Sequence, residues 1–296
     1  MSQNLIYLGY SLAWKIVRLL PEKFAYKLAD RFADLLYGKN GKGVSRLRSN
    51  YQRIRPELNS DQLEFLTNAG MRSYLRYWCD TFRFPGWDNE RLVATTVCDN
   101  ENFLRDAILE KRGCIVALPH AGNWDHAGAY FCAQDIPLTT VVEHLKPERL
   151  FKKFLEHREE MGMEALDLNA RVSATLAQRL RSGKLVALVA DRDLSRSGIT
   201  VNFFDGVARM PGGPAALAIQ TGAPLITAYV AYQPIGISIT FEAPIAVPIS
   251  GTKEEQILAM TQKCADRFAA NISKFPEDWH MLQRIWVDGD FMERSE

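Results

Sequence analysis

The sequence of 296 residues contains no apolar run of the ~18 to 20 residues that a membrane-spanning helix needs. Its apolar stretch near the N-terminus, residues 5–20, is interrupted by Lys15 and Arg18. That stretch also lacks the preceding basic region and the small-residue cleavage site of a signal peptide. We therefore expect a protein that can lie on a membrane surface but does not cross the bilayer.

Cysteine is scarce, and its pattern excludes two classes of protein. The five cysteines are an odd number, and no two of them are closer than sixteen residues. This spacing matches neither a disulfide framework nor a zinc site, so we expect a reducing compartment, no metal and no other cofactor. The sequence also lacks the G-x-S-x-G pattern of a serine nucleophile.

Acidic residues are rare in the first part of the chain. Residues 1–56 contain eleven Lys and Arg against three Asp and Glu, a surplus of eight positive charges. Because the whole chain has a net charge of +1, the remainder has a net charge of −7. Such asymmetry indicates an anionic partner, either lipid headgroups or nucleic acid, or else a solvated basic face. The basic segment 39–55 has only Tyr51 for base stacking, which argues against nucleic acid.

The same N-terminal region has a helical pattern. Apolar residues recur at helical spacing over residues 4–37, with a break at Pro21, and residues 60–82 also read as helical. Tyr7, Tyr10 and Trp14 are aromatic residues of the kind found at membrane interfaces. Two interpretations remain open: the helices lie in a membrane interface, or they pack on the rest of the protein.

From about residue 100, short apolar runs alternate with helical segments. This alternation predicts an α/β fold with a central, mostly parallel or mixed sheet flanked by helices, and with the N-terminal amphipathic helices attached. The predicted strands are 114–118, 138–142, 185–190, 201–204, 225–232 and 237–241, and the predicted helices lie near 124–134, 147–161, 171–182, 213–221 and 253–275.

A histidine and an aspartate follow the first of these strands. His120 comes directly after the apolar run 114–118, and Asp125 falls in the first turn of the next predicted helix. A carboxylate bonded to one ring nitrogen leaves the other nitrogen free to act as a base. We therefore expect His120, oriented by Asp125, to activate a hydroxyl group. The alternative without a catalytic role is a polar loop in which Asp125 caps the helix.

The pattern His120-x4-Asp125 after an apolar strand resembles the signature of the glycerolipid and lysophospholipid acyltransferase superfamily. Three further segments, 191–198, 209–215 and 278–283, are similar to those of the bacterial phosphatidylinositol mannoside acyltransferases, relatives of the late acyltransferases of lipid A synthesis. The resemblance extends to about residue 287. Arg192 stands where the lipid A relatives often have Gln, which favours the mannoside branch.

This resemblance implies roles for individual residues. His120 matches the catalytic base, Asp125 its carboxylate partner, and Asp191 an acidic residue near the catalytic histidine. Glu143 matches an acidic position of the cleft, and Arg158 matches an arginine that holds the donor or the reacting carbonyl. The remaining predicted substrate-binding residues are Asp193, Arg192, Arg196 and Ser197, of which the last three are suited to a phosphate-binding turn.

The resemblance further implies an acyl-CoA-dependent O-acyltransferase that acylates a mannose hydroxyl of a phosphatidylinositol mannoside. The partners would be acyl-CoA, this glycolipid and an anionic membrane surface at the cytoplasmic face, without nucleic acid. We expect one acyltransferase domain over residues 1–296, with residues 1–60 as its membrane-docking segment. Alternatives are another glycolipid or lysophospholipid acceptor, an acyl carrier protein as donor, or an inactive scaffold.

Overall fold

The computed structural model describes residues 3–142, 147–169 and 171–289, and the side chains from Leu8 onward. Four helices come first in the chain: α1 (Gln3–Leu19), α2 (Glu22–Gly38), α3 (Lys42–Ile54) and α4 (Ser60–Arg83). The predicted break at Pro21 is confirmed, since proline has no N–H group with which to continue α1. Among the residues described, no helix has the length and apolar content needed to cross a membrane.

The predicted α/β fold is confirmed. The central sheet has the strand order β1-β9-β8-β2-β5-β3-β4, and every pairing is parallel except that of β8 with β9. The strands are β1 (Thr96–Asp99), β2 (Cys114–Leu118), β3 (Leu138–Val142), β4 (Glu164–Asp167), β5 (Leu185–Val189), β8 (Leu225–Tyr232) and β9 (Ile237–Phe241). A separate antiparallel hairpin consists of β6 (Ile199–Phe203) and β7 (Gly206–Met210).

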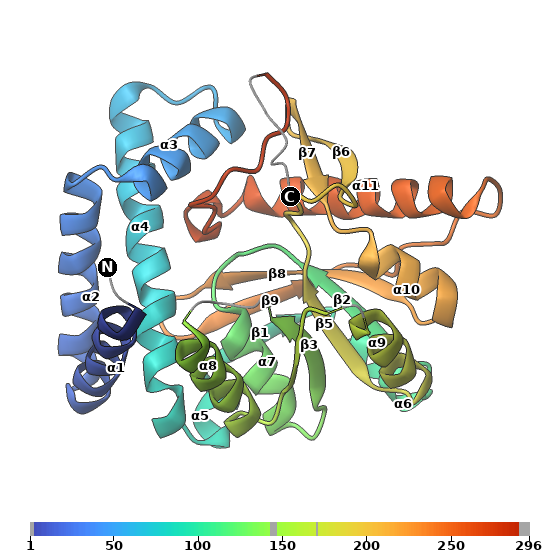
Figure 1. The fold of residues 1–296 in the computed structure, drawn as a ribbon, viewed down its shortest axis with the longest axis horizontal. Coiled ribbons are helices and arrows are strands. Elements are labelled where there is room, and N and C mark those ends of the chain that lie inside the picture. The colour runs from blue at the N-terminus through green and yellow to red at the C-terminus, as the bar shows by residue number, and fades with distance from the viewer. Residues whose placement is uncertain (1–2, 143–146, 170, 290–296) are drawn as a thin grey trace.

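Helices cover both faces of the sheet, while α1–α4 stand as a group beside it (Figure 1). The helices that follow α4 are α5 (Asn89–Ala94), α6 (Asn102–Leu109), α7 (Trp124–Ala133), α8 (Glu148–Glu160), α9 (Val172–Arg181), α10 (Gly213–Thr221) and α11 (Lys253–Ile272). Strand β2 is buried along its whole length. Its alternate residues point to opposite faces, so Ile115 and Ala117 join one core, whereas Val116 and Leu118 join the other.

Three strands and three helices were absent from the sequence-based prediction. Strands β1 and β4 have only four residues each, and each ends on an aspartate, so neither has the continuous apolar run of a central strand. Strand β7 contains Arg209 and pairs only within its hairpin. Helix α3 lies in the basic segment, and its buried residues include Leu47 and Tyr51. Helices α5 and α6 have six and eight residues, too few for a clear periodicity.

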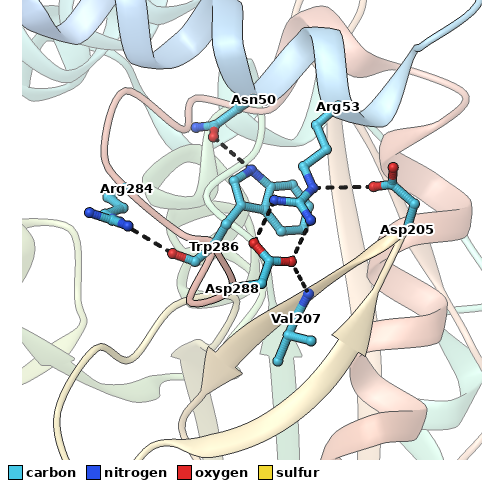
Figure 2. Close-up of polar contacts among 7 residues, drawn as sticks. All are labelled: Asn50, Arg53, Asp205, Val207, Arg284, Trp286 and Asp288. Atoms are coloured by element: carbon cyan, nitrogen blue, oxygen red, sulfur yellow. Dashed lines mark hydrogen bonds and ion pairs between the residues drawn. The ribbon is translucent and has the colours of Figure 1, made fainter. Parts of the chain in front are cut away.

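A polar cluster ties the C-terminal segment to two distant parts of the chain (Figure 2). The Arg53 guanidinium on α3 binds both carboxylate oxygens of Asp288 and also Asp205, which lies in the turn between β6 and β7. The Trp286 indole donates to Asn50 Oδ1 at 3.0 Å, and the Arg53 guanidinium carbon lies 4.3 Å from the centre of the Trp286 ring. We call this cluster the Arg53 clamp. It holds the segment after α11 against α3 and the hairpin.

Candidate active site

The candidate base, His120, lies two residues beyond the end of β2, with 37% of its side chain exposed. Its Nδ1 atom lies 2.6 Å from Asp191 Oδ1. This pairing follows from the register of the sheet, because Leu118 of β2 is opposite Val189 of β5. Continuing two residues past each strand brings His120 and Asp191 face to face at the carboxyl edge, where ligands bind in folds of this kind.

The fully buried Asp191 carboxylate is held from three sides. Its second oxygen, Oδ2, accepts the backbone N–H of His120 and the indole N–H of Trp279, both at 3.0 Å. Burial alone would raise the pKa of Asp191, but the charge on His120 and these hydrogen bonds hold it below its usual value. An ionised carboxylate only accepts hydrogen bonds, so Nδ1 of His120 donates, and in the neutral ring the lone pair is then on Nε2. That is the form a general base requires.

The structure corrects the expected contact between His120 and Asp125. Both oxygens of Asp125 are occupied elsewhere: Arg158 donates to Oδ1 at 2.8 Å and to Oδ2 at 3.2 Å, and the Tyr77 hydroxyl donates to Oδ2 at 2.9 Å. Asp125 lies in the first turn of α7, where its side chain faces α4 and α8 instead of the end of β5. The catalytic roles predicted for His120, Asp125 and Asp191 remain predictions.

The pair formed by Asp125 and Arg158 is almost completely buried. Burial raises the pKa of Asp125, but Arg158 outweighs that effect and leaves the pKa below its usual value. For Arg158, burial lowers the pKa and Asp125 more than compensates, so the guanidinium stays charged. Breaking a buried pair of this kind by removing one partner strands the other charge in a low-dielectric interior. Asp125 and Arg158 therefore fix the position of α8 relative to α7.

An apolar cavity begins beside this ion pair and runs between α7 and the sheet. Trp124, Asp125 and Arg158 line it together with apolar residues from five strands. Its empty space is about 660 Å³, including the part open to solvent. The remaining lining residues include Leu104, Val116, Leu118, Phe131, Leu138, Leu185, Ala187, Val189, Ala228, Val230, Ile239 and Phe241.

The segment 278–280 forms another wall of the site. In the sequence it was noted only for its similarity to the family and was given no role. The His280 backbone N–H donates to the His120 carbonyl at 2.8 Å, and the Gly122 N–H donates to the Asp278 carbonyl, also at 2.8 Å. Since Gly122 already has this partner, its amide is not available as an oxyanion-hole donor. Sequence reasoning assigned no role to Trp279, although the Asp278-Trp279-His280 motif was the available signal.

The other predicted substrate-binding residues are less closely tied to His120. Glu143 lies outside the described residues. Asp193 Oδ1 accepts the Ser195 N–H at 2.9 Å, so its carboxylate stabilises a turn. Arg192 donates to the Arg284 carbonyl, and Arg196 and Ser197 are exposed. Within the described ranges, no hydrogen bond or ion pair joins the Arg192–Ser197 turn to His120.

Three further histidines are buried and uncharged at neutral pH. Burial lowers the pKa of His126 and His157 to about 4 and that of His280 to about 3. His126 follows Asp125 directly in the chain, but its ring packs against Phe84 and Trp87. His126 is therefore 1% exposed and has no access to a substrate at the strand ends.

Comparison with known proteins agrees with this arrangement. Residues 2–287 match the model of the bacterial lipid A biosynthesis acyltransferase family. The chain is 40% identical over 283 residues to a phosphatidylinositol mannoside acyltransferase of Mycolicibacterium smegmatis, covering 95% of this chain and 91% of that protein. It is 37% identical over 284 residues to one of Mycobacterium tuberculosis, covering 94% and 88%.

The match to this family and to these relatives identifies an acyltransferase of the α/β class. The chain belongs to the bacterial lipid A biosynthesis acyltransferase family. The resemblance predicted from the motifs is confirmed at the level of the family.

Proposed function

We propose that this protein transfers a fatty acyl group, palmitoyl in our prediction, from acyl-CoA to a mannose hydroxyl of a phosphatidylinositol mannoside. The observation that carries the proposal is a histidine whose Nδ1 is held by a buried carboxylate and whose ring packs against Trp124, a residue that lines the apolar cavity. The relatives are named for the mannoside acceptor, which supports the same acceptor here. The cavity suits an acyl chain, because each buried methylene contributes about 0.8 kcal/mol to binding.

In the proposed mechanism, Nε2 of His120 takes the proton from the sugar hydroxyl. The hydroxyl oxygen attacks the thioester carbonyl carbon and forms the new ester bond. When the tetrahedral intermediate collapses, the carbon–sulfur bond breaks, and the CoA thiolate takes the proton from the imidazolium. Asp191 stabilises that imidazolium through Nδ1. Arg158 and Asp125 line the cavity, and the thioester would lie beside them.

Product analysis would test this function directly. Purified protein is incubated with palmitoyl-CoA and a panel of acceptors: phosphatidylinositol mannosides, other glycolipids and lysophospholipids. Mass spectrometry should find one added palmitoyl group on the mannoside, with release of CoA. Acylation of a different lipid instead, or transfer only from acyl carrier protein, would support the alternative acyltransferases considered above.

The apolar cavity leads to a prediction about acyl-chain length. Strand β5 contributes Leu185, Ala187 and Val189 to one wall of the cavity, and Val189 is the nearest of the three to the carboxyl edge of the sheet. Four residues of strand span ~13 Å, so Ala187 lies about halfway along this wall. Replacing Ala187 by leucine should block the deeper half. We expect kcat/KM for palmitoyl-CoA to fall at least tenfold, while octanoyl-CoA remains a substrate.

Competition between the two donors measures this preference, and the short donor serves as the internal control for folding. An equal loss with both donors would indicate damage to the fold. An unchanged preference for palmitoyl-CoA would show that the acyl chain lies elsewhere.

The outer faces of α1 and α2 support peripheral attachment to a membrane. Leu8 is 60% exposed, Leu19 is 84% exposed and Phe24 is 63% exposed. Further exposed apolar residues on the same two helices are Leu12, Ile16, Leu28, Phe32 and Leu35. The inner face of α1 packs on α4 and α8, where the Trp14 ring lies 4.9 Å from that of Phe82. The inner face of α1 therefore packs on the rest of the protein, and its outer face is the part that we propose lies in the membrane interface.

Exposed basic residues surround this apolar surface: Lys15, Arg18, Lys23, Lys27 and Arg31. Each cation near an anionic lipid surface contributes about 1 kcal/mol to attachment. We propose that α1 and α2 dock the protein on the anionic cytoplasmic face of the membrane. This would place the carboxyl edge of the sheet near the glycolipid headgroup.

Vesicle co-sedimentation tests the docking surface. The triple substitution of Leu8, Leu12 and Ile16 by serine should weaken binding to anionic vesicles about 100-fold, given ~1 kcal/mol for each partly inserted side chain. Exchanging Lys15, Arg18, Lys23 and Lys27 for glutamate should also abolish the salt sensitivity of binding. The control replaces three exposed apolar residues outside α1 and α2, Leu109, Leu168 and Ile249, by serine. Parent-like binding by the first two variants would place the membrane site elsewhere.

A further inference from the structure

The buried indole of Trp279 contacts the carboxylate that holds the candidate base. Trp279 has no exposed surface, and its Nε1–H donates to Asp191 Oδ2 at 3.0 Å. Asp191 Oδ1, the other oxygen, contacts His120 Nδ1 at 2.6 Å. The indole and the imidazole therefore bind opposite oxygens of one carboxylate and fix its plane.

The backbone around Trp279 is fastened to the loop that carries His120. His280 N–H donates to the His120 carbonyl, Gly122 N–H donates to the Asp278 carbonyl, and Ala121 forms an isolated β-bridge with Trp279. The Asp278 carboxylate accepts the Ser73 hydroxyl at 2.6 Å and the Tyr232 N–H at 2.7 Å. The indole position is thus set by contacts that do not involve Asp191.

We infer that Trp279 is a positioning residue for acyl transfer. Its indole N–H orients the Asp191 carboxylate and withdraws part of the negative charge from the oxygen that faces His120, and it thereby sets the basicity of His120. This inference rests on the proposed function of His120 as general base. A carboxylate that loses a hydrogen-bond donor keeps more charge on the oxygen facing Nδ1. It then stabilises the imidazolium more strongly, and a smaller fraction of His120 is in the neutral form that accepts a proton.

The titratable groups around this pair are few among the described residues. The pKa of His280 is lowered to about 3 by burial, and burial raises the pKa of Tyr229, so neither changes charge between pH 5 and pH 9. Burial raises the pKa of Asp278 to about 6, and its carboxylate faces Ser73 and the Tyr232 backbone. A readout specific to the His120 ring is therefore needed in addition to a pH–rate profile.

The test is the substitution Trp279→Phe, which keeps an aromatic ring and removes the N–H group. We expect kcat to fall about tenfold, the equivalent of one charge-assisted hydrogen bond, with little change in KM. The acidic limb of the pH–rate profile should move to higher pH. The NMR titration of the His120 ring should show the same upward shift of its pKa.

Trp286→Phe is the matched control, because it also removes a buried indole N–H, the one that donates to Asn50 Oδ1 (Figure 2). It should lower the melting temperature and leave the pH–rate profile and the His120 titration unchanged. An unchanged His120 titration in folded Trp279→Phe would overturn the inference.

Two further measurements separate the possible failures. A second measurement on the unmodified protein serves in case Trp279→Phe does not fold. The chemical shift of the Trp279 indole N–H should change with pH at the same midpoint as the His120 ring. An indole signal that ignores that titration overturns the inference. Full transfer activity in His120→Ala would instead exclude His120 as the base, and a parent protein without any acyl transfer would overturn the proposed function. Loss of activity in His120→Ala with parent-like Trp279→Phe would leave the proposed function intact and remove only the role of Trp279.

Discussion

Replacement of His120 by alanine is expected to abolish acyl transfer and to leave the protein folded. A sugar hydroxyl is far too weakly acidic to ionise at neutral pH, so the reaction needs a base at the strand ends. The ring of His120 is partly exposed there, and its Nδ1 is committed to Asp191. The nearby ring of His280 is buried, and its pKa is lowered to about 3, which makes it a poor proton acceptor.

Steady-state assays with palmitoyl-CoA and the mannoside acceptor measure the effect, with circular dichroism and the melting temperature as checks of folding. The control is His126→Asn, because His126 on α7 is buried against Phe84 and Trp87 and should affect stability without ending catalysis. Turnover by folded His120→Ala within tenfold of the parent would exclude His120 as the base.

The second large effect is expected for Asp191→Asn, with a loss of about 10²- to 10⁴-fold in turnover. The amide has nearly the same shape, but its NH₂ group can donate to Nδ1 and so stabilise the wrong tautomer of His120. The neutral amide also stabilises the imidazolium less, so the pKa of His120 should fall. The acidic limb of the pH–rate profile should therefore move to lower pH, opposite to the direction expected for Trp279→Phe.

Two comparisons sharpen this prediction. Asp266→Asn on α11 is a control for the chemical change, since Asp266 is exposed and is contacted by Gln262. Asp125→Asn weakens the pair with Arg158 and should chiefly raise the KM for acyl-CoA. If Asp125→Asn lost more turnover than Asp191→Asn, Asp125 would be the carboxylate that serves the base.

The sequence predicts the central strands and the position of His120 well, because both depend on local pattern. Strand β2 is a continuous apolar run, and His120 follows it directly. Local pattern does not predict which carboxylate contacts His120. Asp191 is 71 residues away, and its contact depends on the register between β2 and β5, which no local pattern encodes. Asp125 is close in the chain, but the helix that contains it turns its side chain toward Arg158.

The segments that form the candidate site are far apart in the chain, so the ribosome synthesises them at different times. His120 becomes available early, whereas the contacts of Trp279 and His280 require almost the whole chain, and the Arg53 clamp closes later still at Asp288. A nascent chain on the ribosome therefore exposes the apolar cavity before it has a completed base. In the function that we propose, a partly made chain would lack an ordered base until residues 278–288 have joined the fold.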